Sequence, residues 1–173
     1  MSNGTLLFLR LVHIVLGVFW VGGATFVALL LMPSLRAVGP AGGAVMQQLA
    51  QVRRMPQWFM AASILTLLSG IGLYWHDSAG FSSSTWLGSG PGQMFGLGGV
   101  LAIAASVVGM AVNSPTARQL GALTAGVQAA GRPPSPDEAA AMQRLQARLA
   151  SAAWLVAVPL LLATAAMALA RYV

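Results

Sequence analysis

Apolar residues in this chain occur in long continuous runs rather than in an alternating pattern. A strand of a membrane barrel would instead show about ten residues of alternating polarity. Four runs are long enough for a helix to cross the hydrocarbon core of a bilayer, which needs about 20 residues, and they lie at 5–32, 57–76, 93–113 and 149–171. The pattern predicts an all-α, polytopic membrane protein, an antiparallel four-helix transmembrane bundle forming a single domain over residues 1–173.

The composition agrees with this prediction. Hydrophobic residues make up 57% of the chain and charged residues 7%, against roughly 25% charged in an ordinary soluble domain. Cysteine is absent, which excludes disulfides and thiolate metal sites. The sequence has two His and only three Asp and Glu residues. Because so few polar side chains are available, we expect no independent catalytic activity.

The basic residues predict an orientation, and all nine of them are arginine. The connections after the first and third spans carry Arg36, Arg53, Arg54, Arg118, Arg132, Arg144 and Arg148, whereas the connection after the second span carries none. By the positive-inside rule, 36–54 and 115–148 face the cytoplasm, and both termini and 77–92 lie outside. We therefore expect a multi-pass protein of the bacterial cytoplasmic (inner) membrane. Its arginines would contact anionic membrane lipids, and they show no pattern of nucleic-acid binding.

The two cytoplasmic connections predict helices of their own. The stretch 41–55 shows the three- and four-residue intervals of an amphipathic helix. Leu49 lies four residues after Val45, three after Met46 and three before Val52. Ser135 and Glu138 have the spacing of a capping box, which predicts a helix that continues unbroken into the fourth span. Gly131 is suited to end a preceding helix that begins near Pro115.

The first span carries two ionisable residues, Arg10 and His13, within its apolar run. They share one helix face with Gly17, Trp20 and Ala24. Exposing an ionisable side chain to lipid costs at least about 2.5 kcal/mol, so this face is predicted to point into the outer half of the bundle. Two alternatives stay open: Arg10 could reach the lipid headgroups, and His13 could make a structural hydrogen bond within the bundle.

The second span offers a partner for His13. One of its faces carries Thr66, Ser69, Leu73 and His76, and antiparallel packing places both histidines in the outer half. Imidazoles from facing helices can hold haem b or a copper ion, so His13 and His76 are candidate metal ligands. His13 lies roughly 10 Å below the outer end at the rise of a helix, so both would ligate one iron only if the spans are staggered. Alternatively, His76 belongs to an interfacial aromatic belt.

Three stretches resemble known membrane proteins. "HIVLGVFWVGG" in the first span and "RRMPQWFMAASILTLLSGIGLYW" around the second resemble helices of the copper-resistance protein D family and of the haem-binding membrane protoporphyrinogen oxidase family. The tail "RLASAAWLVAVPLLLATAAMALARYV" resembles an uncharacterised bacterial family of four-span membrane proteins allied to them. The resemblance implies a four-helix membrane fold, with His13 at the position of the oxidase's first-helix histidine. The chain has no lysine to match the one in the oxidase's third helix, which argues against protoporphyrinogen oxidation.

These observations favour haem b, in a protein that serves electron transfer or haem handling with a redox partner on the outer side. His13 would supply an axial nitrogen, Arg10 would pair with a propionate, and Gly17 would leave room for the macrocycle beside Trp20. His76 is the second candidate ligand.

Two other functions stay open. Copper binding or transport would use soft methionine ligands, but Met32, Met60, Met94, Met110 and Met167 are scattered over the four spans. A cofactor-free accessory or assembly subunit of a larger membrane complex needs only faces where helices approach closely. Small residues of this kind are Gly17, Ala24, Gly96, Gly99 and Ala102.

Overall fold

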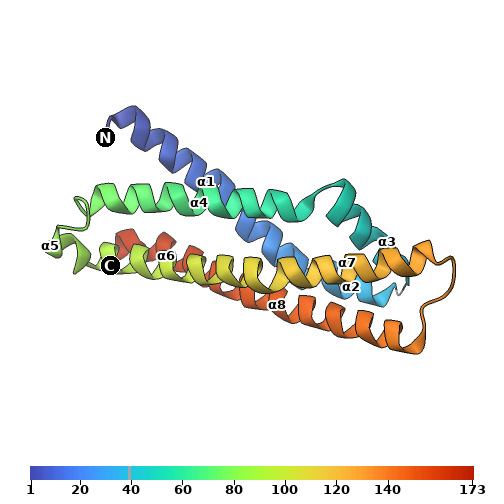
Figure 1. The fold of residues 1–173 in the computed structure, drawn as a ribbon. Helices are drawn as coiled ribbons and strands as arrows, with labels where there is room; N and C mark the ends of the chain where they lie inside the picture. Colours follow the sequence, from blue (N-terminus) through green and yellow to red (C-terminus); the bar gives the residue numbers. More distant parts are fainter. Residues whose placement is uncertain (39) are drawn as a thin grey trace.

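The computed structural model describes residues 1–38 and 40–173, and the elements in this part of the chain are all helical (Figure 1). The first half comprises α1 (Asn3–Phe26), η1 (Val27–Leu31), α2 (Met32–Ala37), α3 (Pro40–Gln47), η2 (Gln48–Val52) and α4 (Met55–Asp77). The second half comprises α5 (Ser84–Leu87), α6 (Gly90–Val108), η3 (Gly109–Asn113), α7 (Ser114–Ala129), α8 (Pro136–Leu169) and η4 (Ala170–Tyr172). The segments η1, η2 and η3 are π-helical, and η4 is a 3-10 turn.

In the part of the chain that the structure describes, four continuous helices are long and apolar enough to cross a membrane, which confirms the four predicted spans. They are Asn3–Ala37, Met55–Asp77, Gly90–Ala129 and Pro136–Tyr172. The third has 40 residues, or about 60 Å at 1.5 Å per residue, twice the thickness of a hydrocarbon core. The third and fourth helices therefore continue well beyond their apolar stretches, and α8 runs unbroken from the capping box into the fourth span, as predicted.

The helix expected to begin near Pro115 is not separate from the third span. Helix α7 continues from α6 through the π-helical segment η3. A proline lacks the N–H that an α-helix needs, and the wider π turn absorbs this defect just before Pro115, where Ser114 Oγ donates to the Gly109 carbonyl oxygen over 3.2 Å. Segment η1 likewise precedes Pro33. Both spans therefore extend through a proline instead of ending at it.

The most extensive helix contacts join α1 to α4 and α6 to α8. Along the first pair, Leu9 lies beside Gly72 and Phe59 beside Gly23, so the residue numbers run in opposite directions. In Figure 1 both chain termini lie at the end of the molecule that holds α5. The connections that contain α2, α3 and α7 lie toward the opposite end.

Small residues allow α6 and α8 to approach closely. Ala105 of α6 is 0% exposed and lies in one cluster with Val156 and Leu160 of α8, and a Cβ at Gly98 would lie 2.8 Å from Met167 Cγ. The predicted small-residue face of the third span is correct at Ala102, which is buried, and at Gly96, which leaves room for a side chain of α4, but not at Gly99. A Cβ at Gly96 would approach the Tyr74 hydroxyl, and Gly99 has nothing within 4 Å of that position. The contact face thus follows Gly98, Ala102 and Ala105, four and then three residues apart, rather than a strict three-residue step.

The helix predicted over 41–55 is present but irregular. Residues of α3 and η2 are helical up to Val52. The expected apolar face is divided, since Met46 and Leu49 are partly buried whereas Val45 is 46% and Val52 62% exposed. Val45 and Val52 lie seven residues apart and therefore share one side of the helix, which is the exposed edge of the face that Met46 and Leu49 bury.

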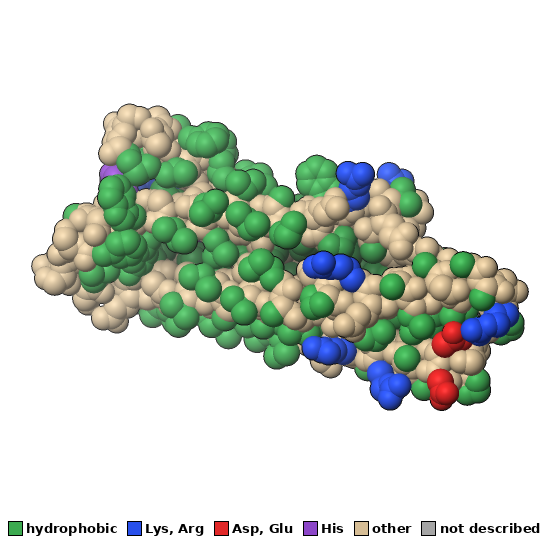
Figure 2. Space-filling view, viewed as in Figure 1, with side chains coloured by type: hydrophobic (Ala, Val, Ile, Leu, Met, Phe, Trp, Pro, Cys, Tyr) green, Lys and Arg blue, Asp and Glu red, His purple; other side chains and the backbone are tan. Residues whose placement is uncertain are grey.

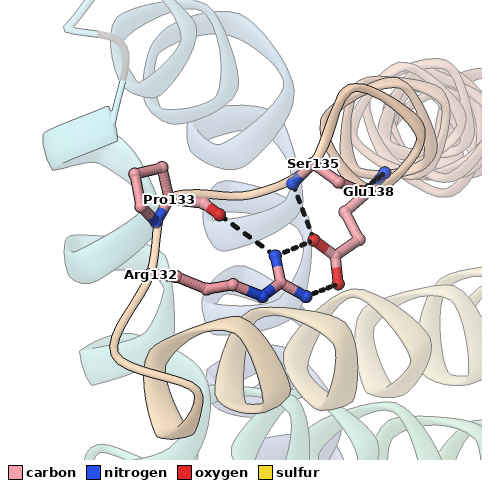
Figure 3. A network of polar contacts seen from close by, with 4 residues as sticks. All are labelled: Arg132, Pro133, Ser135 and Glu138. Atoms are coloured by element: carbon pink, nitrogen blue, oxygen red, sulfur yellow. Dashed lines mark hydrogen bonds and ion pairs between the residues drawn. The ribbon is translucent and has the colours of Figure 1, made fainter.

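The start of α8 has the capping box that the sequence predicts (Figure 3). Ser135 Oγ accepts from the Glu138 N–H over 3.3 Å, and the Ser135 N–H donates to Glu138 Oε2 over 2.7 Å. The structure adds Arg132, whose guanidinium donates to both Glu138 oxygens over 2.8 and 2.9 Å. Gly131 has φ +62° directly after α7, where it ends that helix as predicted.

The ion pair between Arg132 and Glu138 shifts the pKa values of both side chains. Glu138 lies in the first turn of α8, before the apolar stretch of that helix. The hydrogen bond from Arg132 and then the one from the Ser135 backbone lower the pKa of Glu138 from 4.5 to about 2. The same pairing raises the pKa of Arg132. The guanidinium of Arg132 thus holds the turn between α7 and α8, and its contact with membrane lipids stays a prediction.

Candidate functional site

The imidazole of His13 lies at the contact between α1 and α4. Its Nδ1 is 2.8 Å from the carbonyl oxygen of Thr66. A Cβ at Gly70 would lie 2.7 Å from His13 Cε1, so the ring occupies space that the glycine leaves open. His13 therefore packs against one turn of α4, from Thr66 to Gly70. The structural hydrogen bond that the sequence left open for His13 is present.

This contact fixes the tautomer of a neutral His13. A carbonyl oxygen has no proton to give, so Nδ1 donates the hydrogen bond. In a neutral imidazole the other nitrogen, Nε2, then carries the lone pair. A histidine whose Nδ1–H donates to a backbone carbonyl is a common arrangement among metal ligands. The geometry thus leaves Nε2 of His13 as the nitrogen that could bind a metal.

The face that begins with His13 points inward from Gly17 onward. A Cβ at Gly17 would lie 3.6 Å from Thr66 Cγ2, and Trp20 and Ala24 are buried at 4% and 7% exposure. These residues pack between helices, so Gly17 is covered by α4. Arg10, predicted to point inward with them, is exposed. It lies at the edge of the face and near the start of α1, which diverges from α6 and α8 in Figure 1.

His76 is not brought together with His13. Its Nδ1 lies 3.1 Å from Asp77 Oδ1, and its side chain is 35% exposed. His13 packs on Gly70, and His76 follows six residues later, which is roughly 9 Å further along α4. Within the described residues, no group of three or more His, Asp or Glu side chains could hold a metal ion. The stagger that both histidines would need to share one iron is absent from this arrangement.

The structure also contains a large cavity that the sequence did not predict. It has a volume of about 720 Å³ and lies between α1 to α4 on one side and α6 to α8 on the other. Trp20 lines it, whereas His13 does not. Three of the five methionines that are scattered over the spans, Met32, Met60 and Met110, line it together with Met46 and Met55 from the connection between the first two spans, whereas Met94 and Met167 do not. This convergence depends on how the helices pack, so no local sequence signal could reveal it.

No protein-family model, curated protein or solved structure matches this chain.

Proposed function

We propose that the chain is an antiparallel four-helix membrane protein of the bacterial cytoplasmic membrane, with its termini outside. Support comes from the four apolar helices and from the seven arginines of 36–54 and 115–148. On the face shown in Figure 2, most basic side chains lie on the half away from α5, and the other half is largely hydrophobic. This asymmetry is the one that the positive-inside rule associates with a cytoplasmic side.

Within that protein we propose that His13 ligates haem b, for electron transfer or haem handling in the outer half. The observation that carries the proposal is the 2.8 Å contact between His13 Nδ1 and the Thr66 carbonyl oxygen. It orients the ring and leaves Nε2 as the atom that would bind the iron. Haem b would supply one-electron chemistry at its iron when bound.

The other predicted residues fit this cofactor unequally. Arg10 is exposed one turn nearer the outer end than His13, where its guanidinium could pair with a propionate. Gly17 and Trp20 are packed against neighbouring helices, so they would position α1 and not contact the macrocycle. His76 pairs with Asp77 instead. The proposal therefore assigns one protein ligand to the iron.

The visible absorption spectrum of the purified protein, alone and titrated with haemin, tests this function. We expect a Soret band that is lost in His13→Ala and kept in His76→Ala, the matched control on α4. Arg10→Ala should weaken retention while leaving the iron ligated. Circular dichroism would verify that each variant is folded. An unaltered spectrum in His13→Ala, or no haem uptake by the wild-type protein, would overturn the proposal.

A cofactor-free accessory or assembly subunit is the second candidate function. The same His13 contact favours it, because a hydrogen bond from α1 to the α4 backbone also locks two helices together. Co-purification with a defined set of membrane proteins, together with absence of haem and copper, would favour this function.

Copper binding or transport is the third candidate, and the five methionines around the cavity favour it through their soft sulfur atoms.

A further inference from the structure

The cavity near the arginine-rich end has two chemically different ends. Its deeper part is lined by Trp20, Phe59 and Val156. Its other end is lined by the polar side chains Arg36, Gln47, Gln51, Asn113, Arg118 and Gln146. Trp20 and Arg36 are separated by about 24 Å along the first helix. The cavity thus changes from apolar to polar along the same axis as the helices, as a membrane lipid does.

The polar end carries positive charge. Arg36 and Arg118 both line it, and none of the described lining residues is Asp or Glu. The Arg36 guanidinium donates to the Gln146 carbonyl oxygen over 3.0 Å, which holds it at the cavity. Gln128 Nε2 donates to Gln47 Oε1 over 3.3 Å and connects α7 to α3 at this end. The charge complementarity favours an anionic group.

Two buried polar groups indicate that the cavity is built for a ligand. Ser106 is 4% exposed, and its Oγ has no hydrogen-bond partner among the described residues. Asn113 Oδ1 is likewise buried without a partner there. Both residues line the cavity. A buried polar atom without a hydrogen bond is unfavourable, and a rotation of either side chain toward a bound molecule would relieve this cost, with Ser106 Oγ donating to an oxygen atom and Asn113 Oδ1 accepting from a hydroxyl group.

The cavity has the size of a small-molecule site, and its wall can adapt to ligands of different shape. Its volume of about 720 Å³ lies within the range of roughly 300–1,000 Å³ typical of small-molecule sites. Methionine side chains fill irregular apolar space around ligands of variable shape. Residues of η1, η2 and η3 also line the cavity, and π-helical turns often occur at functional sites.

We propose that this cavity binds an amphiphile with one anionic headgroup, which contacts Arg36 and Arg118, and an apolar tail that extends toward Trp20. The headgroup can be a free carboxylate, as in a fatty acid, or the phosphate of a membrane lipid. The site does not include His13, so it is independent of the haem proposal. Ser106 Oγ would donate to an oxygen atom of the ligand, and Asn113 Oδ1 would accept from a hydroxyl group where the headgroup carries one.

Quenching of Trp20 fluorescence in nanodiscs tests the site. A variant that keeps Trp20 and carries Phe at the other four tryptophans reports on the deep end, and one that keeps the exposed Trp75 is the control. The probes are dibromostearate, dibromo-phosphatidylglycerol and dibromo-phosphatidylcholine, all brominated on the acyl chain. We expect saturable quenching of Trp20 by an anionic probe and quenching of Trp75 only in proportion to probe content. The carboxylate and phosphate probes distinguish a fatty acid from a membrane lipid.

Substitutions identify the two ends of the site. Arg36→Gln with Arg118→Gln should raise the half-saturating probe concentration about tenfold, whereas Arg144→Gln, which removes a charge that does not line the cavity, should not. A Cβ at Gly109 or at Gly99 would meet nothing within 4 Å, but only Gly109 lines the cavity. Gly109→Leu should therefore block the quenching, and Gly99→Leu should preserve it.

Three results would overturn the proposal. The first is equal quenching of Trp20 by phosphatidylcholine and the anionic probes, which would show bulk lipid in the cavity. The second is unchanged affinity in the double arginine variant. The third is the absence of saturable quenching together with Cu(I) binding that requires the cavity methionines, which would make this a metal site.

Discussion

The ring of His13 occupies the space that a side chain at Gly70 would need, since a Cβ there would lie 2.7 Å from His13 Cε1. The same ring donates to the Thr66 carbonyl oxygen over 2.8 Å. Gly70 and the hydrogen bond thus depend on one close approach of α1 to α4. Gly70, which has no side chain, therefore determines the orientation of His13, the candidate iron ligand.

Gly70→Ala should displace the His13 ring and break its hydrogen bond. We expect a loss of about 1–3 kcal/mol in the free energy of unfolding, measured in mixed detergent micelles. Gly22→Ala is the control, because a Cβ at Gly22 meets nothing within 4 Å. If haem binds through His13, Gly70→Ala should also reduce its retention. Equal stability of both variants would show that the ring is not held in place as described.

Ala157→Leu should destabilise the packing of α8 on η1, where Ala157 is buried in one cluster with Ala28 and Ala153. Ala157 is 0% exposed, and additional methyl groups in a closely packed position typically cost about 1–3 kcal/mol. Ala165 lies on the exposed side of the same helix, so Ala165→Leu serves as the control. Thermal unfolding in detergent should show a lower midpoint for the first variant alone. An unchanged midpoint would contradict the close packing.

The carboxyl group of Glu138 should titrate near pH 2. Because its pKa is lowered from 4.5 to about 2 in the folded protein, the pairing stabilises the turn above pH 4.5. This stabilisation is lost as the pH falls from 4.5 through 2. Glu138 is the only glutamate in the sequence, so ¹³C-glutamate labelling gives a single carboxyl resonance.

Arg132→Gln should raise the pKa measured for Glu138 toward 4.5, because Arg132 is the largest cause of its lowering. Arg144→Gln, on the same helix as Glu138, is the control and should leave the titration unchanged. A titration of Glu138 near pH 4.5 in the wild-type protein would show that the ion pair does not form in solution.

Single cysteines in this cysteine-free chain should establish the orientation in the membrane. Ser84 and Ala130 are suitable positions because both are exposed. The neighbouring serines of the same connections, Ser83 and Ser135, are less suitable because their hydroxyl groups cap α5 and α8. With an impermeant maleimide applied to spheroplasts, we expect Ser84→Cys to be labelled and Ala130→Cys to be labelled only after lysis. Labelling of both from the same side would contradict the proposed topology.

The sequence by itself determined the four apolar helices, the capping box at Ser135 and the end of α7 at Gly131. These features depend on residues close together in the chain, where hydrogen-bonding capacity and apolar length are local properties. The sequence also identified His13 as a residue that must find a polar partner, because an imidazole inside an apolar span is costly when exposed to lipid.

Only the tertiary structure decided which partner His13 has. The relative position of α1 and α4 places His13 on Thr66 and Gly70 instead of beside His76. It also turns Arg10 outward and assigns Trp20 to the cavity. That cavity combines residues from distant parts of the chain, around the π-helical turns. These turns change the direction of side chains, and an analysis based on a regular repeat of 3.6 residues does not include that change. Helix packing, and not local sequence, brings these residues together, because it depends on the fit of whole helix surfaces.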